Sequence, residues 1–110
     1  MQAFEISDLI DEQVRSSKPY LEFLKHPSLS AGLYVLPVGG IDGQQPHSED
    51  EVYYVVSGRG MFRHEDEDRP VQAGSILFVA AGVEHRFHSI SEALSIIVFF
   101  APAEYSNRTS

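Results

Sequence analysis

The residues best suited to chemistry lie in the segment QPHSEDE, which spans residues 45–51. Gln45 and His47 are two positions apart, so their side chains would point to the same side of a strand, and Glu51 shares this parity. A straight strand would nevertheless separate the Cα atoms of His47 and Glu51 by about 13 Å, whereas metal–ligand bonds are only about 2 Å long. A shared metal site therefore requires the chain to bend at residues 48–50, and the polarity of that segment is typical of a turn.

A second histidine, His85, follows Gly82 at the start of a separate strand-like run. Combined with the first segment, it predicts a site built from nitrogen and oxygen ligands, because the chain has no cysteine to supply thiolates or disulfides. The spacing alone leaves two interpretations open. One is a metal site, and the other is an acidic, solvated loop that lies beside a histidine and binds nothing.

Short strand-forming runs must position these candidates. After Pro19 the chain contains runs rich in Val, Ile, Leu, Tyr and Phe that are divided by turn residues. The runs span residues 20–25, 32–38, 51–56, 60–65, 75–80, 84–90 and 94–100. Seven or eight strands at this spacing predict an all-β sandwich or barrel. We expect one or two helical turns over residues 7–15 and a charged turn over residues 65–70.

Several of these runs are apolar on both faces rather than alternating. The sequences VYYVV, ILFVA and IIVFF show this pattern. A strand that is apolar on both sides in so small a domain indicates that one face lies against another subunit. Apolar residues in the N-terminal segment strengthen the expectation of a homodimer.

Composition limits the class of protein and the partners. The chain has 110 residues, enough for one hydrophobic core, and its formal net charge is −8. Such an acidic surface repels phosphate backbones and anionic lipid, so we expect neither nucleic acid nor membrane as a partner. The N-terminus shows no secretory signal and no apolar stretch is long enough to span a bilayer. We therefore expect a cytoplasmic location.

Two motifs in the chain resemble those of the cupin family, in the form of a small single-domain cupin. The first family motif runs Gly, His, His, Glu, Gly, and the second runs Gly, Pro, Gly, His, Asn. The corresponding residues here are Gly39, Gln45, His47, Glu51 and Gly58, followed by Gly74, Ala80, Gly82, His85 and Ser89. The spacings agree throughout, so the departures are Gln45, Ala80 and Ser89. The last two affect only a turn and its hydrogen bonding.

The resemblance implies a fold and a division of the chain. The fold is all-β, a cupin double-stranded β-helix in which two antiparallel sheets form a jelly-roll barrel, with a short N-terminal helical arm. We expect the arm over residues 1–18, the cupin barrel over residues 19–103 and a flexible tail over residues 104–110.

The resemblance also implies that His47, Glu51 and His85 bind one divalent metal ion per chain, which would be Fe, Mn, Ni, Co or Zn. Two histidines and one carboxylate form the facial set typical of non-haem iron, which leaves positions for water or substrate. Gln45 stands where the motif has its first histidine. Its side-chain oxygen would be a weak fourth ligand or would bind a coordinated water.

Two aromatic residues are candidate walls of a substrate-binding pocket. Tyr53 shares strand parity with Glu51, and Phe87 shares it with His85. Ordinary core packing explains both residues equally well. By the same argument His88 should point away from the site, and His64 should be solvated in its charged turn.

Two functions fit these expectations. The first is a metal-dependent enzyme of the dioxygenase, isomerase or lyase type, in which the metal activates oxygen or polarises a small oxygenated molecule. The second is a non-catalytic cupin that binds a small molecule in the same pocket. Free metal positions beside a polar group favour the enzyme, whereas a sealed or saturated site favours the binding protein.

Overall fold

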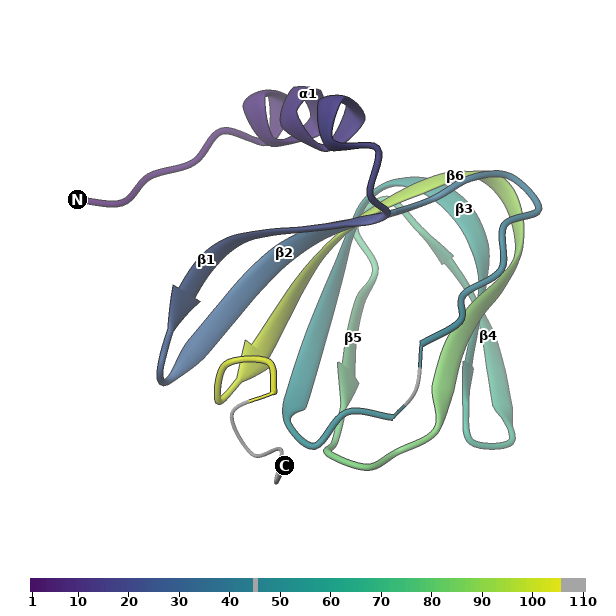
Figure 1. Cartoon of the computed structure of the whole chain (residues 1–110). Coiled ribbons are helices and arrows are strands. Elements are labelled where there is room, and N and C mark those ends of the chain that lie inside the picture. The colour runs from purple at the N-terminus through teal and green to yellow at the C-terminus, as the bar shows by residue number, and fades with distance from the viewer. Residues whose placement is uncertain (45, 106–110) are drawn as a thin grey trace.

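The computed structural model describes residues 1–44 and 46–105 as an antiparallel β-structure with one helix (Figure 1). The elements are α1 (Ile6–Ser16), β1 (Tyr20–His26), β2 (Leu29–Leu36), β3 (Asp50–His64), β4 (Glu67–Gln72), β5 (Ile76–Val79) and β6 (His85–Ala101). The predicted all-β fold with a short N-terminal helix is confirmed.

The strands form one hydrogen-bonded sheet that bends into the two layers of a jelly roll. Its order is β1-β2-β6-β3-β4, and β5 pairs with the other edge of β3. The first half of β3 pairs with β5 and with the end of β6. Its second half pairs with β4 and with the beginning of β6. Because β3 and β6 run through both layers, their curvature closes the barrel around the interior (Figure 1).

The expected number of strands was wrong because Gly58 does not end a strand. β3 continues through Gly58 and joins the two runs expected at 51–56 and 60–65, while β6 joins those expected at 84–90 and 94–100. Gly58 has a φ of +100°, and the register of the β3–β6 ladder shifts on both sides of it. A Cβ atom there would lie 2.1 Å from the Ala93 carbonyl oxygen. The glycine therefore serves a bulge at which the strand bends and twists.

The segment expected to be a charged turn is mostly a strand. Only Glu65 and Asp66 form the turn, and the residues that follow belong to β4. This strand has exposed charged side chains and buries Val71 alone. It lies at an edge of the sheet, where charges and a proline discourage pairing with other chains.

Two apolar clusters hold the fold together. The larger one fills the barrel interior and includes Tyr53, Phe87 and Phe100. The smaller one lies on the outside, where Leu9 of α1 packs against Leu33 and Ile97. The amphipathic helix thus covers part of the outer face of the sheet at β1 and β2 (Figure 1). Within the described ranges 1–44 and 46–105, no helix is long and apolar enough to span a membrane.

Candidate metal centre

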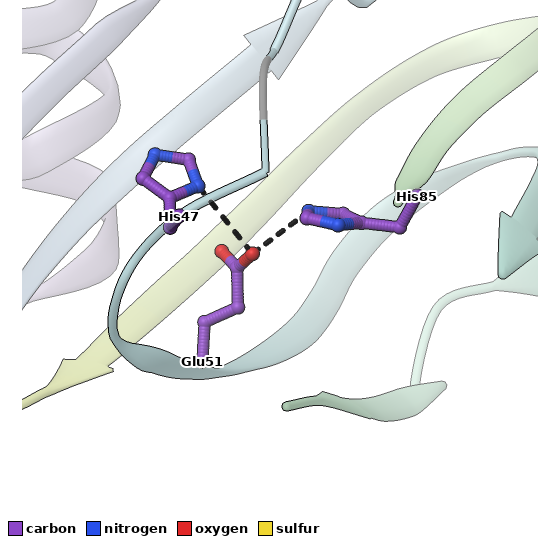
Figure 2. Close-up of side chains that lie close together, drawn as sticks. All are labelled: His47, Glu51 and His85. Atoms are coloured by element: carbon purple, nitrogen blue, oxygen red, sulfur yellow. Dashed lines mark ion pairs between the residues drawn. The ribbon is translucent and has the colours of Figure 1, made fainter. Parts of the chain in front are cut away.

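Three predicted ligands converge at one end of the barrel. His47 lies in the loop before β3, Glu51 is the second residue of β3, and His85 is the first residue of β6 (Figure 2). One ligand atom from each residue lies within 4.8 Å of the other two. Glu51 Oε1 is 2.7 Å from His85 Nε2 and 3.6 Å from His47 Nδ1. The side chains are 1% (Glu51), 0% (His85) and 11% (His47) exposed, so the group is almost entirely shielded from solvent.

The expected bend between His47 and Glu51 is present and is held by hydrogen bonds. The chain bends at residues 48 and 49 before β3 begins. The His47 carbonyl accepts the Gly82 N–H at 2.7 Å, and Asp50 Oδ1 accepts the Ala81 N–H at 2.8 Å. These two bonds attach the loop to the turn that precedes His85. They explain how residues 38 positions apart in sequence come to share a site.

Each histidine is oriented by an oxygen atom on its outer side. His85 Nδ1 lies 2.8 Å from the Val83 carbonyl, to which an Nδ1–H donates. His47 Nε2 lies 3.2 Å from Glu104 Oε2, to which an Nε2–H donates. In these neutral tautomers the remaining nitrogen of each ring presents a lone pair toward Glu51. Metal-binding histidines commonly have this second hydrogen bond.

The charges in the group stabilise one another. Burial by itself raises the pKa of Glu51, but interactions with His47 and His85 outweigh it and hold that pKa below its ordinary value. The hydrogen bond to Glu104 and the nearby carboxylate of Glu51 raise the pKa of His47 to about 9, against the opposing effect of burial. Burial lowers the pKa of His85, but Glu51 more than compensates, so that this pKa is also raised. When no metal ion is bound, the negative charge of Glu51 is therefore balanced by a protonated imidazole of the group.

The donor set suits a divalent cation. Both Glu51 oxygens and His47 Nδ1 are buried, and among the described residues none of these atoms has a well-aligned hydrogen-bond partner. A buried carboxylate without aligned donors is costly unless a cation compensates it. Two imidazole nitrogens and a carboxylate are the ligands that Fe, Mn, Co, Ni and Zn accept. The residues present thus fit the metal that the fold implies.

Tyr53 and Phe87 have different positions. The Tyr53 hydroxyl lies 2.9 Å from His85 Nε2 and within 3.3 Å of Gln44 Nε2, so it reaches the ligand group. Phe87 is 1% exposed and packs edge-on against Tyr53 at a ring distance of 5.0 Å. Both rings belong to the buried core cluster, and Tyr53 in addition places its hydroxyl beside His85. That either residue contacts a substrate stays a prediction.

A buried aspartate supports this arrangement from the opposite side. Asp42 accepts hydrogen bonds from the Tyr34 hydroxyl at 2.8 Å and the Phe87 N–H at 2.9 Å. It also accepts bonds from the backbone and side chain of Gln44. Gln44 in turn contacts the Tyr53 hydroxyl. Asp42 therefore fixes the loop that carries Gln44 and, through it, the orientation of Tyr53.

A cavity of about 890 Å³ opens beside His47. Its walls include Tyr20, Glu104 and Lys25. The Tyr20 hydroxyl is buried and has no hydrogen-bond partner among the described residues. Burial and the nearby Glu104 carboxylate raise the pKa of this hydroxyl well above its usual range, so it stays protonated and can only donate or accept as a neutral phenol. Its ring lies against β2 because Gly32 has no side chain, and a Cβ there would be 2.2 Å from the ring.

Several functional residues were not predicted from the sequence. Glu104 was assigned to a flexible tail, yet it is 9% exposed and touches His47. Asp42 and Tyr20 carried no motif or spacing signal. Gln45 falls outside the described residues, so its role as a weak ligand stays a prediction. His88 points away from the site, as expected, and its Nε2 lies 2.7 Å from Asp68.

Comparison with known proteins places these features in context. The sequence model of the cupin domain matches residues 32–100. An uncharacterized protein of Streptomyces coelicolor is 45% identical over 104 residues, which cover 94% of this chain and 99% of that protein. An oxalate-binding protein of Thermotoga maritima is 32% identical over 68 residues, 57% of this chain and 56% of that protein. A crystal structure from Bacillus halodurans superimposes with a TM-score of 0.74 at 21% identity, covering 92% of this chain and 82% of that one.

Proposed function

This chain belongs to the cupin family, and we propose that it binds one divalent metal ion through His47, Glu51 and His85 and acts on a small oxygenated molecule beside that ion. The observation that carries the proposal is the convergence of two inward-facing imidazoles on a buried carboxylate that lacks aligned donors. When bound, the ion would act as a Lewis acid toward an oxygen of the ligand.

The residues around the ligand group have separable tasks in this proposal. The Tyr53 hydroxyl is close enough to His85 to contact a molecule in the site, and Gln44 holds it there. The Tyr20 hydroxyl donates to an oxygen of a molecule in the cavity, because a buried donor without a partner is otherwise costly. Three protein ligands leave coordination positions free, and with two hydroxyls nearby this arrangement favours an enzyme over a passive binding protein.

Metal content is the direct test of the ligand set. Protein purified without chelator should contain about one divalent metal ion per chain. His47→Ala and His85→Ala should abolish it, because each variant removes one of three ligands. The matched controls are His64→Ala and His88→Ala, which remove an imidazole from outside the group. Metal retained by both of the first two variants would show that these histidines are not ligands.

A non-catalytic role is the second candidate, and one observation favours it. The Thermotoga relative is named for binding oxalate. Oxalate is a small oxygen-rich anion and is therefore the first ligand to titrate into metal-loaded protein. Binding of oxalate without turnover, in assays of oxygen consumption and of product formation on Fe(II)- and Mn(II)-loaded protein, would favour the binding protein. Turnover that is lost in Tyr53→Phe would favour the enzyme.

We further propose that the protein is a homodimer. The outer face of β3, β5 and β6 carries Tyr54, Ile76, Phe78 and Phe99, which are 38–67% exposed. Val52 pairs with both Phe78 and Phe99, so these side chains form one continuous apolar patch. A stable dimer buries on the order of 1,600 Å² in total, and contiguous exposed apolar surface is typical of such interfaces. Light scattering that detects only the 12.3 kDa chain at micromolar concentration would contradict the proposal.

A further inference from the structure

The chain continues after β6 into a short segment that is attached to the barrel by three hydrogen bonds. The Ala103 N–H donates to the Pro27 carbonyl at 3.4 Å. The Glu104 N–H donates to Ser30 Oγ at 2.8 Å. The Tyr105 N–H donates to Glu49 Oε1 at 2.8 Å. The segment thus bridges the β1–β2 hairpin and the loop that carries His47, and its backbone cannot move independently of either.

This attachment directs the Glu104 side chain at His47. Glu104 Oε2 lies 3.2 Å from His47 Nε2, and the two side chains are 10% and 11% exposed. The Ser30 hydroxyl that holds the Glu104 backbone is fully buried. The Phe100 ring packs against the His47 ring at a centroid distance of 4.7 Å. Ion pairs on the exposed surface contribute little to stability because water screens them. The contact between Glu104 and His47 is largely shielded from water, so this screening is reduced.

We propose that Glu104 is a positioning residue for the metal ligand His47. By accepting the Nε2–H, Glu104 selects the tautomer in which Nδ1 carries the lone pair, and it holds that nitrogen toward Glu51. It also makes the imidazole a stronger electron donor, as carboxylate partners of metal-binding histidines do. The inference rests on the proposed function, because it assumes that His47 binds a metal ion.

Glu104 lies outside the two cupin motifs. The family match ends at residue 100, whereas the two motifs supply only the ligands themselves. The segment that follows β6 therefore contributes the partner of one ligand, just as Val83 contributes the partner of the other. The partner of His47 is a charged side chain, whereas the partner of His85 is a neutral backbone carbonyl. A side-chain substitution can therefore change the electron-donor strength of His47 but not, in the same way, that of His85.

The test compares metal affinity across four proteins. Wild type, Glu104→Gln, Glu104→Ala and Glu92→Gln are titrated with Co²⁺ and Mn²⁺ alone, and the unfolding midpoint of each metal-free protein is measured in urea. Glu104→Gln keeps the shape of the side chain and an acceptor oxygen, whereas Glu104→Ala removes both. Glu92→Gln is the matched control for the loss of one negative charge, because Glu92 is 64% exposed and forms an ion pair with the exposed Arg59.

The expected result is a graded loss of affinity. Expressed as pH-independent constants, from which the competition of protons for His47 is removed, the metal affinity of Glu104→Ala should be about 10- to 100-fold weaker than that of wild type, as is found when such partners are removed elsewhere. The affinity of Glu104→Gln should lie between the two. Glu92→Gln should bind as wild type does. The visible absorption spectrum of the Co²⁺-loaded protein should shift in both Glu104 variants, because the electronic character of one ligand changes, while the urea midpoint of Glu104→Gln stays close to that of wild type.

Three outcomes would overturn the inference, and they are distinguishable. Wild-type protein that binds no Co²⁺ or Mn²⁺ would refute the proposed function together with the inference. Wild-type binding with unchanged affinity and Co²⁺ spectrum in Glu104→Gln and Glu104→Ala would refute the role of Glu104 alone. A weakened affinity with an unchanged Co²⁺ spectrum and a urea midpoint lowered in both variants would assign Glu104 to the stability of the fold instead.

Discussion

Protons and a divalent ion compete for His47, so metal affinity should depend on pH far more steeply than for an ordinary histidine. A metal ion binds the neutral imidazole, and the proton must leave first. In the metal-free protein, the hydrogen bond to Glu104 and the nearby carboxylate of Glu51 hold the pKa of His47 at about 9. Across the neutral range most of the protein therefore carries a proton at this site, and raising the pH releases it.

The magnitude follows from that pKa. With a pKa of about 9, roughly one imidazole in a thousand is neutral at pH 6 and roughly one in eleven at pH 8, so the apparent metal affinity should rise about 90-fold. A histidine with the usual pKa near 6.5 would give a rise of only about 4-fold over the same interval. The raised pKa of His85 acts in the same direction and adds to the slope.

The assay is a titration with Mn²⁺ at pH 6, 7 and 8 at constant ionic strength, with free Mn²⁺ followed by electron paramagnetic resonance. Isothermal calorimetry of the same titration, in buffers of different ionisation enthalpy, measures the number of protons released on metal binding. This number should be about one or more per metal ion at pH 7. Glu104→Ala should flatten the dependence, because it removes the hydrogen bond that contributes most to the raised pKa of His47, and Glu104→Gln should flatten it less, because it keeps an acceptor oxygen. A rise of less than about 5-fold in wild type between pH 6 and pH 8 would refute the reasoning.

Four further predictions concern stability, ligand binding and assembly. Protonated His47 stabilises the metal-free fold, because its pKa is raised on folding; this contribution is complete below pH 6.5 and is lost as the pH rises through about 9. The urea midpoint of the metal-free protein should therefore fall between these pH values, and a constant or rising midpoint would contradict the prediction. Tyr20→Phe should leave the urea midpoint unchanged or higher, because it removes a buried hydroxyl without a partner among the described residues. The same variant should weaken oxalate binding by Mn²⁺-loaded protein about 2- to 10-fold. A clearly lower midpoint would show that the hydroxyl makes a structural hydrogen bond. Gly58→Ala should destabilise the protein by about 2 kcal/mol or more, measured by denaturant unfolding, because its φ is +100° and a Cβ would meet the Ala93 carbonyl. Phe78→Glu should convert the proposed dimer to a 12.3 kDa species in light scattering, since it places a charge in the apolar patch, and an unchanged mass would locate the interface elsewhere.

The parts of the structure that were predictable from the sequence are those that depend on local spacing. The strand-forming runs and turn glycines predicted the all-β fold, and the two motifs predicted the convergence of His47, Glu51 and His85. The number of strands was not predictable in the same way. A glycine with positive φ occurs both at hairpins and at bulges, and only the pairing of β3 with β6 shows that Gly58 is at a bulge.

The supporting residues could not be predicted because no local pattern identifies them. Glu104 reaches His47 only after the chain has closed the barrel, and these two residues are 57 positions apart. Asp42 is an acidic residue in a Gly-rich loop, which is usually a solvated position, and its burial depends on the backbone N–H of Phe87. Tyr20 lines the cavity with its ring packed over Gly32 of the neighbouring strand, which leaves room for that ring because it has no side chain.

The docking of the C-terminal segment onto the β1–β2 hairpin also has a consequence for the order of folding. The bond between Glu104 and Ser30 joins residues 74 positions apart and extends the β2–β6 ladder, in which Ser30 pairs with Phe100, so these contacts together close a loop that contains most of the chain. Closure of a long loop costs entropy that is recovered only when the contacts within it exist. We therefore expect the β3–β6 ladder, with the three ligands already in place, to form first and the outer support of His47 to form last. Native-state hydrogen exchange should show this as an early-opening unit at the two ends of the chain, with the β3–β6 amides protected much longer.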